Sequence, residues 1–183
     1  MTKSGFYTAV GDRGDTGRLG GKQRLSKSDA LMEVIGAVDE ATSAIGMARA
    51  LAHEVARAAR EVARTEALLT IQQHLSRLMA HLSATPDARE RFPGVSEDEV
   101  AWLEELIAQM EEGLPPLKEF VYPGDSVPGA ALHVARAAIR RAERRIVAFT
   151  EVEPGIGAVN LAYVNRLSSL LFVAALREDQ RET

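Results

Sequence analysis

The N-terminal segment holds the first residues whose types and spacing indicate chemistry. Residues 4–25 contain six glycines, a density that no regular helix tolerates. Within them, the stretch 7–17 combines backbone N–H groups that can close around an anion with the hydroxyls of Thr8 and Thr16 and the cation of Arg13. These are the components of a phosphate-binding loop.

The loop is not a Walker motif. Thr16 stands where that motif needs a glycine five residues before Gly21, and Gln23 follows Lys22 where the motif has Ser or Thr. Judged on its glycines alone, the segment is also consistent with a flexible N-terminal arm. The pattern by itself therefore predicts anion binding and no particular nucleotide.

A second group of candidate residues lies between Ala131 and Glu143. His133, Arg136, Arg140 and Glu143 are spaced so that they share one face of a helix. A solvated basic stripe is the structural alternative. However, Arg136 and Arg140 lie close to the apolar edge of this helix, and partly buried guanidinium groups need carboxylate or phosphate partners. We therefore expect this face to bind a polyanion.

Two polar residues on other helices complete the candidates. Asp39 lies near the inner edge of an otherwise apolar face and is a natural counter-charge for the arginines, although a structural salt bridge between helices explains it equally well. Asn165 is the second, with a helix-capping or core amide role as its alternative.

The histidines do not predict a di-iron centre. Helical bundles build such centres on Glu-x-x-His pairs, and none of His53, His74, His81 or His133 has Glu three residues before it. Because the chain has no cysteine, disulfides and thiolate ligands are excluded as well.

Composition limits the class of protein. The 183 residues fit one domain, and 46% apolar residues with only 5% aromatic residues favour helices. The net charge of −4 argues against general nucleic-acid binding. The N-terminus lacks the apolar stretch of a secretory signal, and no window approaches the length of a membrane span. We expect a soluble, cytoplasmic protein without membrane contact.

Apolar periodicity predicts an all-α fold. It indicates a five-helix bundle, with a four-helix core plus an extra helix, in residues 26–183, preceded by the glycine-rich loop in residues 1–25. The expected helices begin near Ser28, near Val62, at a capping box of Ser96 and Glu99, at Ser126 with Pro128, and near Ala158. The stretches 87–93 and 120–124 are expected to be connectors.

In combination, these segments resemble the propanediol-utilisation type of ATP:cob(I)alamin adenosyltransferase over nearly the whole chain. The matching motifs are the loop Tyr7 to Thr16 with Ser26-Lys27, Gly36-Ala37-Val38-Asp39-Glu40, Phe120-Val121-Tyr122-Pro123-Gly124, residues 131–136 with 140–144, and Asn165-Arg166-Leu167-Ser168. Each motif is weak alone, but their number and order are specific.

The resemblance implies a homotrimer that binds ATP between neighbouring subunits. ATP would be bound by Thr8, Gly11, Asp12, Gly14, Thr16, Lys27, Arg136, Arg140, Glu143 and Asn165, to which the loop cation Arg13 is added. Asp39 would pair with Arg136 to shape the site, and these two residues with Arg140 would be catalytic. Phe120 would press on the lower face of the corrin, and Phe172 would line the same pocket with Asp39.

The implied activity is a cob(I)alamin or cob(I)yrinic acid a,c-diamide adenosyltransferase. The Co(I) corrinoid would attack the ribose C5′ of ATP and expel triphosphate, whose charge Arg136, Arg140 and Lys27 would stabilise with Mg²⁺. No protein ligand of the metal is assigned. By displacing the lower axial ligand, Phe120 would make cobalt reducible by a flavoprotein reductase, and an adenosylcobalamin-dependent enzyme would receive the product.

The sequence departs from the family pattern at several positions. The family usually has Arg or Lys where Ala9 stands and a polar residue at Val10. Ile35 and Thr42 replace Tyr and Asn, and Ser169 replaces Asp. Two alternatives to an active enzyme follow: a corrinoid-binding or delivery protein without efficient turnover, and a structural bundle whose basic face binds an acidic partner.

Overall fold

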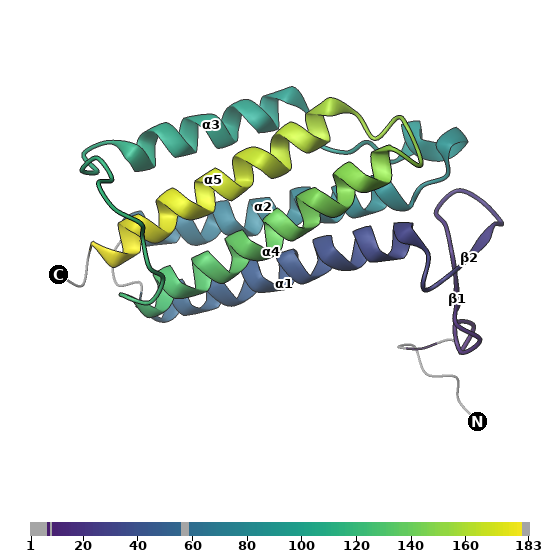
Figure 1. The fold of residues 1–183 in the computed structure, drawn as a ribbon, viewed down its shortest axis with the longest axis horizontal. Helices are drawn as coiled ribbons and strands as arrows, with labels where there is room; N and C mark the ends of the chain where they lie inside the picture. Colours follow the sequence, from purple (N-terminus) through teal and green to yellow (C-terminus); the bar gives the residue numbers. More distant parts are fainter. Residues whose placement is uncertain (1–6, 8, 56–58, 181–183) are drawn as a thin grey trace.

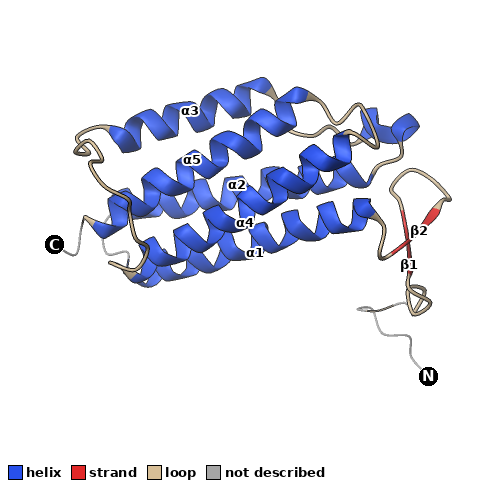
Figure 2. Cartoon of the chain, in the orientation of Figure 1, coloured by secondary structure: helices blue, strands red, loops and turns tan. Residues whose placement is uncertain are grey.

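Five long helices form a bundle in the computed structural model, which describes residues 7, 9–55 and 59–180 (Figure 1). The helices are α1 (Ala30–Val55), α2 (Ala59–Ser83), α3 (Glu97–Glu111), α4 (Val127–Thr150) and α5 (Ala158–Asp179). Two short strands, β1 (Asp15–Gly17) and β2 (Arg24–Ser26), precede them, and a 3-10 helix, η1 (Pro86–Arg91), follows α2 (Figure 2). The predicted all-α bundle is confirmed.

Local signals set the starts of three helices. Asp29 Oδ1 accepts a hydrogen bond from the Leu31 amide at 2.9 Å, one residue before α1 begins. At α3, the Ser96 hydroxyl accepts from the Glu99 amide while the Glu99 carboxylate accepts from the Ser96 amide, which is the predicted capping box. The Ser126 hydroxyl caps α4 by accepting from Gly129 at 3.0 Å.

The core lies between α1, α2, α4 and α5, and α3 is the extra helix. α1 packs against α2 and α4, α4 packs against α5, and α3 packs on α5. The apolar stripe predicted for α4 is buried throughout: it consists of Leu132, Ala135, Ile139, Ala142, Ile146 and Phe149. This stripe fixes the rotation of α4, and with it the direction of the arginines beside the stripe.

Two connecting segments carry more structure than the sequence predicted. The segment 87–93, expected to be a connector, is largely the 3-10 helix η1. The N-terminal loop contains an antiparallel hairpin in which Thr16 pairs with Leu25. Gly20 turns the hairpin with a φ of 79°, which a side chain rarely adopts.

The expectation that no segment approaches the length of a membrane span is wrong for α5. Among the helices that the structure describes, α5 alone is long and apolar enough to qualify by length and composition. In this fold, 56% of its most apolar window is buried inside the bundle. Packing in the protein core therefore accounts for its apolar residues.

The capping box gives a stability prediction. We expect Ser96→Ala to lower the free energy of unfolding by about 1 kcal/mol, because the Glu99 amide loses its acceptor, and Ser96→Gly to cost only a few tenths. Urea unfolding followed by circular dichroism measures both variants. Equal losses in the two variants would show that the cap does not stabilise α3.

Candidate active site

The predicted phosphate-binding loop is held as a compact unit by hydrogen bonds to the hairpin. The Lys27 amide donates to the Gly14 carbonyl at 2.8 Å, and the Lys27 ammonium donates to the Gly11 carbonyl at 2.9 Å. Arg24 makes an ion pair with Asp15 at 2.7 Å and lowers the pKa of that carboxyl. The structure therefore brings the predicted residues Gly11, Gly14 and Lys27 together.

The other predicted loop residues lie on the same unit, with one exception. Asp12 and Arg13 are exposed to solvent, and Thr16 is partly buried in β1. Thr8 lies outside the described residues. Ala9 has a φ of 58°, the only positive φ of a non-glycine residue in the part of the chain that the structure describes. This left-handed backbone costs an L-residue about 1–2 kcal/mol, so the tight turn at Ala9 is a strained position.

Lys27 packs closely against Gly11. A Cβ at residue 11 would stand 3.0 Å from the Lys27 Nζ atom, so the ammonium would have to shift by a few tenths of an ångström. The Lys27 side chain is otherwise exposed, and its ammonium holds only a neutral carbonyl. An incoming phosphate can therefore recruit this cation.

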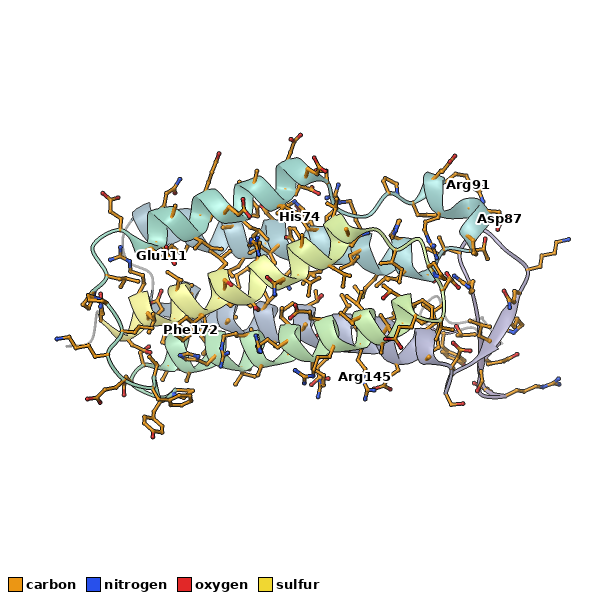
Figure 3. The ribbon with its side chains drawn as sticks, turned by 45° about the horizontal axis from the view of Figure 1, so that its top comes forward. His74, Asp87, Arg91, Glu111, Arg145 and Phe172 are labelled. Carbon is orange, nitrogen blue, oxygen red and sulfur yellow. The ribbon has the colours of Figure 1, made fainter. Side chains whose placement is uncertain are left out.

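The second predicted group meets between α4 and α5. The Arg136 guanidinium lies over the ring of Phe172, 5.7 Å from its centroid, and the ring of His133 approaches the same phenyl edge-on at 5.9 Å. Figure 3 shows Phe172 on α5, facing the helix that carries these two residues. The Arg136 Nε atom is buried and has no hydrogen-bond partner. A partly buried cation without a carboxylate partner can bind an anion.

Glu143 and Asn165, both predicted to bind ATP, are joined by a hydrogen bond. The Asn165 amide donates to Glu143 Oε1 at 2.9 Å, and the Asn165 carbonyl oxygen accepts from Arg166 at 3.0 Å. Arg166 is in turn paired with Glu104 on α3 at 2.7 Å. Arg140 is exposed on the neighbouring turn of α4, and no carboxylate of the described chain pairs with it.

The expected pairing of Asp39 with Arg136 is not made within one chain. Asp39 is exposed on α1 rather than at the inner edge of the bundle. On the α1–α4 edge, Arg141 contacts Glu40 and Arg145 contacts Glu33, which shows that the two helices run antiparallel. Arg136 precedes Arg141 by more than a turn and therefore faces a part of α1 that lies beyond Asp39.

Phe120 lies far from the nucleotide loop of the same chain. It is 77% exposed on the connector between α3 and α4, with Tyr122 edge-on at 5.1 Å. In Figure 1 this connector and the hairpin occupy opposite ends of the bundle. Arg136 lies 14 residues before the end of α4 that faces the hairpin, so about 21 Å along the helix axis separates it from that end. One chain therefore holds two separate halves of the predicted site.

His133 was noted in the sequence only as part of a basic face. In the structure its side chain is 4% exposed, and neither ring nitrogen has a hydrogen-bond partner. Burial lowers the pKa of His133, and the neighbouring Arg136 lowers it further, while Asp179 on α5 raises it. Helical spacing places His133 with the arginines and off the apolar stripe, so the sequence indicated neither its burial nor its missing partners.

The chain is similar to known proteins over most of its length. A family model described as cobalamin adenosyltransferase matches residues 6–178. The chain belongs to the cobalamin adenosyltransferase family. The expected activity, corrinoid adenosyltransferase, and the assignment to the transferases are thereby confirmed, as is the resemblance to the propanediol-utilisation type.

Individual relatives support this membership over most of their lengths. The corrinoid adenosyltransferase of Mycobacterium tuberculosis is 38% identical over 170 residues, which cover 92% of this chain and 85% of the relative. The corrinoid adenosyltransferase of Bacillus subtilis is 38% identical, with 93% and 84% covered. A variant of the PduO-type ATP:corrinoid adenosyltransferase from Lactobacillus reuteri, solved with cobalamin and ATP, is 36% identical with a TM-score of 0.83. The match covers 96% of this chain and 91% of that one.

The buried imidazole of His133 predicts a pH dependence of stability. Because its pKa is lowered in the fold, the unfolded chain takes up the proton first as the pH falls below about 6.5. Stability should therefore decrease on acidification from pH 7.5 to 5.5. We expect His133→Phe to reduce this decrease, measured as the difference in urea midpoint between the two pH values. The same difference in variant and wild type would contradict the assignment.

Proposed function

We propose that this adenosyltransferase moves the 5′-deoxyadenosyl group of ATP to cob(I)alamin and releases triphosphate. The electron pair of Co(I) forms the bond to C5′, the C5′–O bond breaks, and the triphosphate oxygen leaves with that bond's electron pair. The observation that carries the proposal is Arg136, a partly buried guanidinium on the face of Phe172 without a carboxylate partner in the described chain. The leaving triphosphate supplies the missing negative charge.

Arg140 and Lys27 complete the binding of triphosphate in this proposal. Arg140 is exposed one turn from Arg136, and Lys27 holds only the Gly11 carbonyl. Gly14 would let the loop backbone approach the phosphates, and the side chains of Asp12, Arg13 and Thr16 would lie beside them. The amides of Asp12 and Gly14 close turns onto the carbonyls of Ala9 and Gly11. Fixed cations around the leaving group lower the barrier because charge develops there as the C5′–O bond breaks. Glu143, held by Asn165, would accept a hydrogen bond from ATP.

The separated halves support a site between subunits of a homotrimer. The hairpin of one chain would supply the loop, and α4 of the next chain would supply the arginines. The exposed Asp39 and the unpaired Arg136 would then form their ion pair across the same contact. Closed rings of heterologous contacts give each subunit one complete site.

The corrinoid half of the site would use aromatic surface. Phe120 is exposed on its connector and would press on the lower face of the corrin, and Phe172 would line the pocket from α5. Exclusion of the lower ligand leaves cobalt four-coordinate, so that a flavoprotein reductase can reach Co(I). An adenosylcobalamin-dependent enzyme would then take the product, and we place these steps in the cytoplasm.

Mg²⁺ would enter as its complex with ATP. Among the described residues, no group of three His, Asp or Glu side chains could hold a metal ion. Mg²⁺ commonly keeps several waters and binds through substrate phosphates with one or two carboxylates. The donors present thus fit a metal delivered by the nucleotide, where it would neutralise triphosphate charge. In this proposal, residues 1–183 form one domain.

The first test is turnover. Purified protein mixed with ATP, Mg²⁺ and chemically reduced cob(I)alamin should produce the visible spectrum of adenosylcobalamin. Arg140→Ala should lower kcat by roughly 10²–10³-fold, because a preorganised cation on the leaving group is lost. Arg145→Ala is the matched control on the same helix. Its exposed ion pair with Glu33 contributes little, so kcat should stay within about twofold.

The assay also separates the alternatives. Wild-type protein that binds cobalamin and ATP without forming product would indicate a corrinoid-binding or delivery protein. Protein that shows no saturable ATP binding would indicate a structural bundle. Equal kcat losses in Arg140→Ala and Arg145→Ala would show that the role of Arg140 was misassigned.

The second test asks whether the site is shared between subunits. Asp39→Ala and Arg136→Ala should each lose roughly a hundredfold in activity, because the ion pair proposed to shape the site is lost. Co-expressed with different tags and purified as mixed trimers, they should recover about a third of wild-type activity, because one contact in three then carries both native residues. Mixed trimers as inactive as the single variants would place the pair within one chain.

A further inference from the structure

The hairpin is tied to the bundle by a cluster of two arginines and one carboxylate. Arg18, directly after β1, donates from both terminal nitrogens to Glu153 in the α4–α5 connection, at 2.8 and 2.9 Å. Arg89 of η1 contacts the same carboxylate from the other side. The exposed fractions of the three side chains are 6%, 19% and 10% for Arg18, Glu153 and Arg89. We call these residues the Arg18–Glu153–Arg89 cluster.

The backbone around Arg18 reinforces this attachment. Arg18 also donates to the Ala84 carbonyl at 2.6 Å, and Leu19 exchanges backbone hydrogen bonds with Ser83 and Thr85 at 3.1 and 2.9 Å. Gly20 approaches η1 so closely that a Cβ there would stand 2.2 Å from the Ala88 Cβ atom. The strand-to-strand turn thus lies directly on the end of α2 and on η1 (Figure 3, near Asp87 and Arg91).

The cluster holds two positive charges and one negative charge, and its side chains are largely shielded from water. The Arg18 guanidinium, with Arg89 beyond it, lowers the pKa of Glu153. A partly buried carboxylate between two guanidinium groups is strongly held, because its removal would leave both cations without a counter-charge. Bidentate geometry also fixes orientation, since both Arg18 nitrogens must lie in the plane of the carboxylate.

The cluster acts on the loop that carries the predicted nucleotide contacts. Among the described residues, all side-chain hydrogen bonds and ion pairs between the hairpin and the helical bundle come from Arg18. The loop is tied to β2 through Lys27 and Arg24, and β2 is paired with β1. Without the Arg18 side-chain contacts, the described part of the hairpin would keep only the backbone hydrogen bonds of Leu19 to the bundle, and the whole loop would become more mobile with it.

We propose that Arg18 and Glu153 are positioning residues that preset the hairpin for ATP, although neither belongs to the nucleotide site. This inference rests on the proposed function of the loop. A hairpin that is free to move is competent to bind ATP only part of the time, and the apparent affinity falls by that fraction. The arginines on α4 are untouched, so bound ATP still reacts at its normal rate.

Arg18→Met and Arg89→Met provide a matched pair of variants. Each removes one guanidinium from the same carboxylate and keeps similar bulk. Arg18→Met should raise the KM for ATP about tenfold with kcat and the corrinoid KM within about twofold, whereas Arg89→Met should leave all three within about twofold. Glu153→Gln should also raise the KM for ATP, and the double variant Arg18→Met/Glu153→Gln should add little to Arg18→Met, because both substitutions remove the same bidentate ion pair.

Hydrogen exchange provides a readout that does not require turnover. Without nucleotide, the amides of residues 15–26 should exchange about tenfold faster in Arg18→Met than in wild type, while those of α4 stay unchanged. An unaltered ATP KM with unaltered exchange, or equal increases in the two methionine variants, would overturn the proposal. A wild type without adenosyltransferase activity would overturn the proposed function instead, and the exchange rates would still decide whether Arg18 holds the hairpin.

Discussion

Helix α4 has to bury one apolar stripe while it carries five arginines, and the rest of the structure follows from that constraint. The stripe from Leu132 to Phe149 is buried against α1 and α5, which fixes the helix rotation. Arg141 and Arg145 then reach carboxylates on α1. Arg136 is directed instead onto Phe172, where the described chain offers no carboxylate. A single rotation angle thus separates the arginines that pair with carboxylates of α1 from Arg136, which does not.

Much of the fold could be predicted because its signals are local. The apolar period of α4, the Ser96 capping box and the Ser126 cap each depend on residues of a single helix and its cap, and all three are present. Glu143 and Asn165 were each expected near ATP through the family resemblance, but the hydrogen bond between them, across 22 positions, was not predicted. Relations between the candidate residues therefore come from the fold and not from the motifs.

Relations between distant segments are what the sequence could not reveal. Arg18 and Glu153 are 135 positions apart, and neither stands in a recognisable motif. Asp39 was placed at an inner edge because apolar neighbours define a helix face only to within the width of one side chain, and a small error in angle separates a buried position from an exposed one. The missing partners of His133 depend on the packing of α5, which periodicity does not specify.

Carboxylates are distributed differently at the hairpin contact and along α4. Where the hairpin meets the bundle, one glutamate satisfies two guanidinium groups, and the segment is held without any ligand. Along α4, Arg136 and Arg140 have no carboxylate partner in the described chain, so they can bind negative charge that comes from outside it. In the proposed trimer, Asp39 of a neighbouring subunit supplies a counter-charge to Arg136 and orients its guanidinium. Arg140 would then remain for the triphosphate, because neither the described part of this chain nor that ion pair gives it a carboxylate.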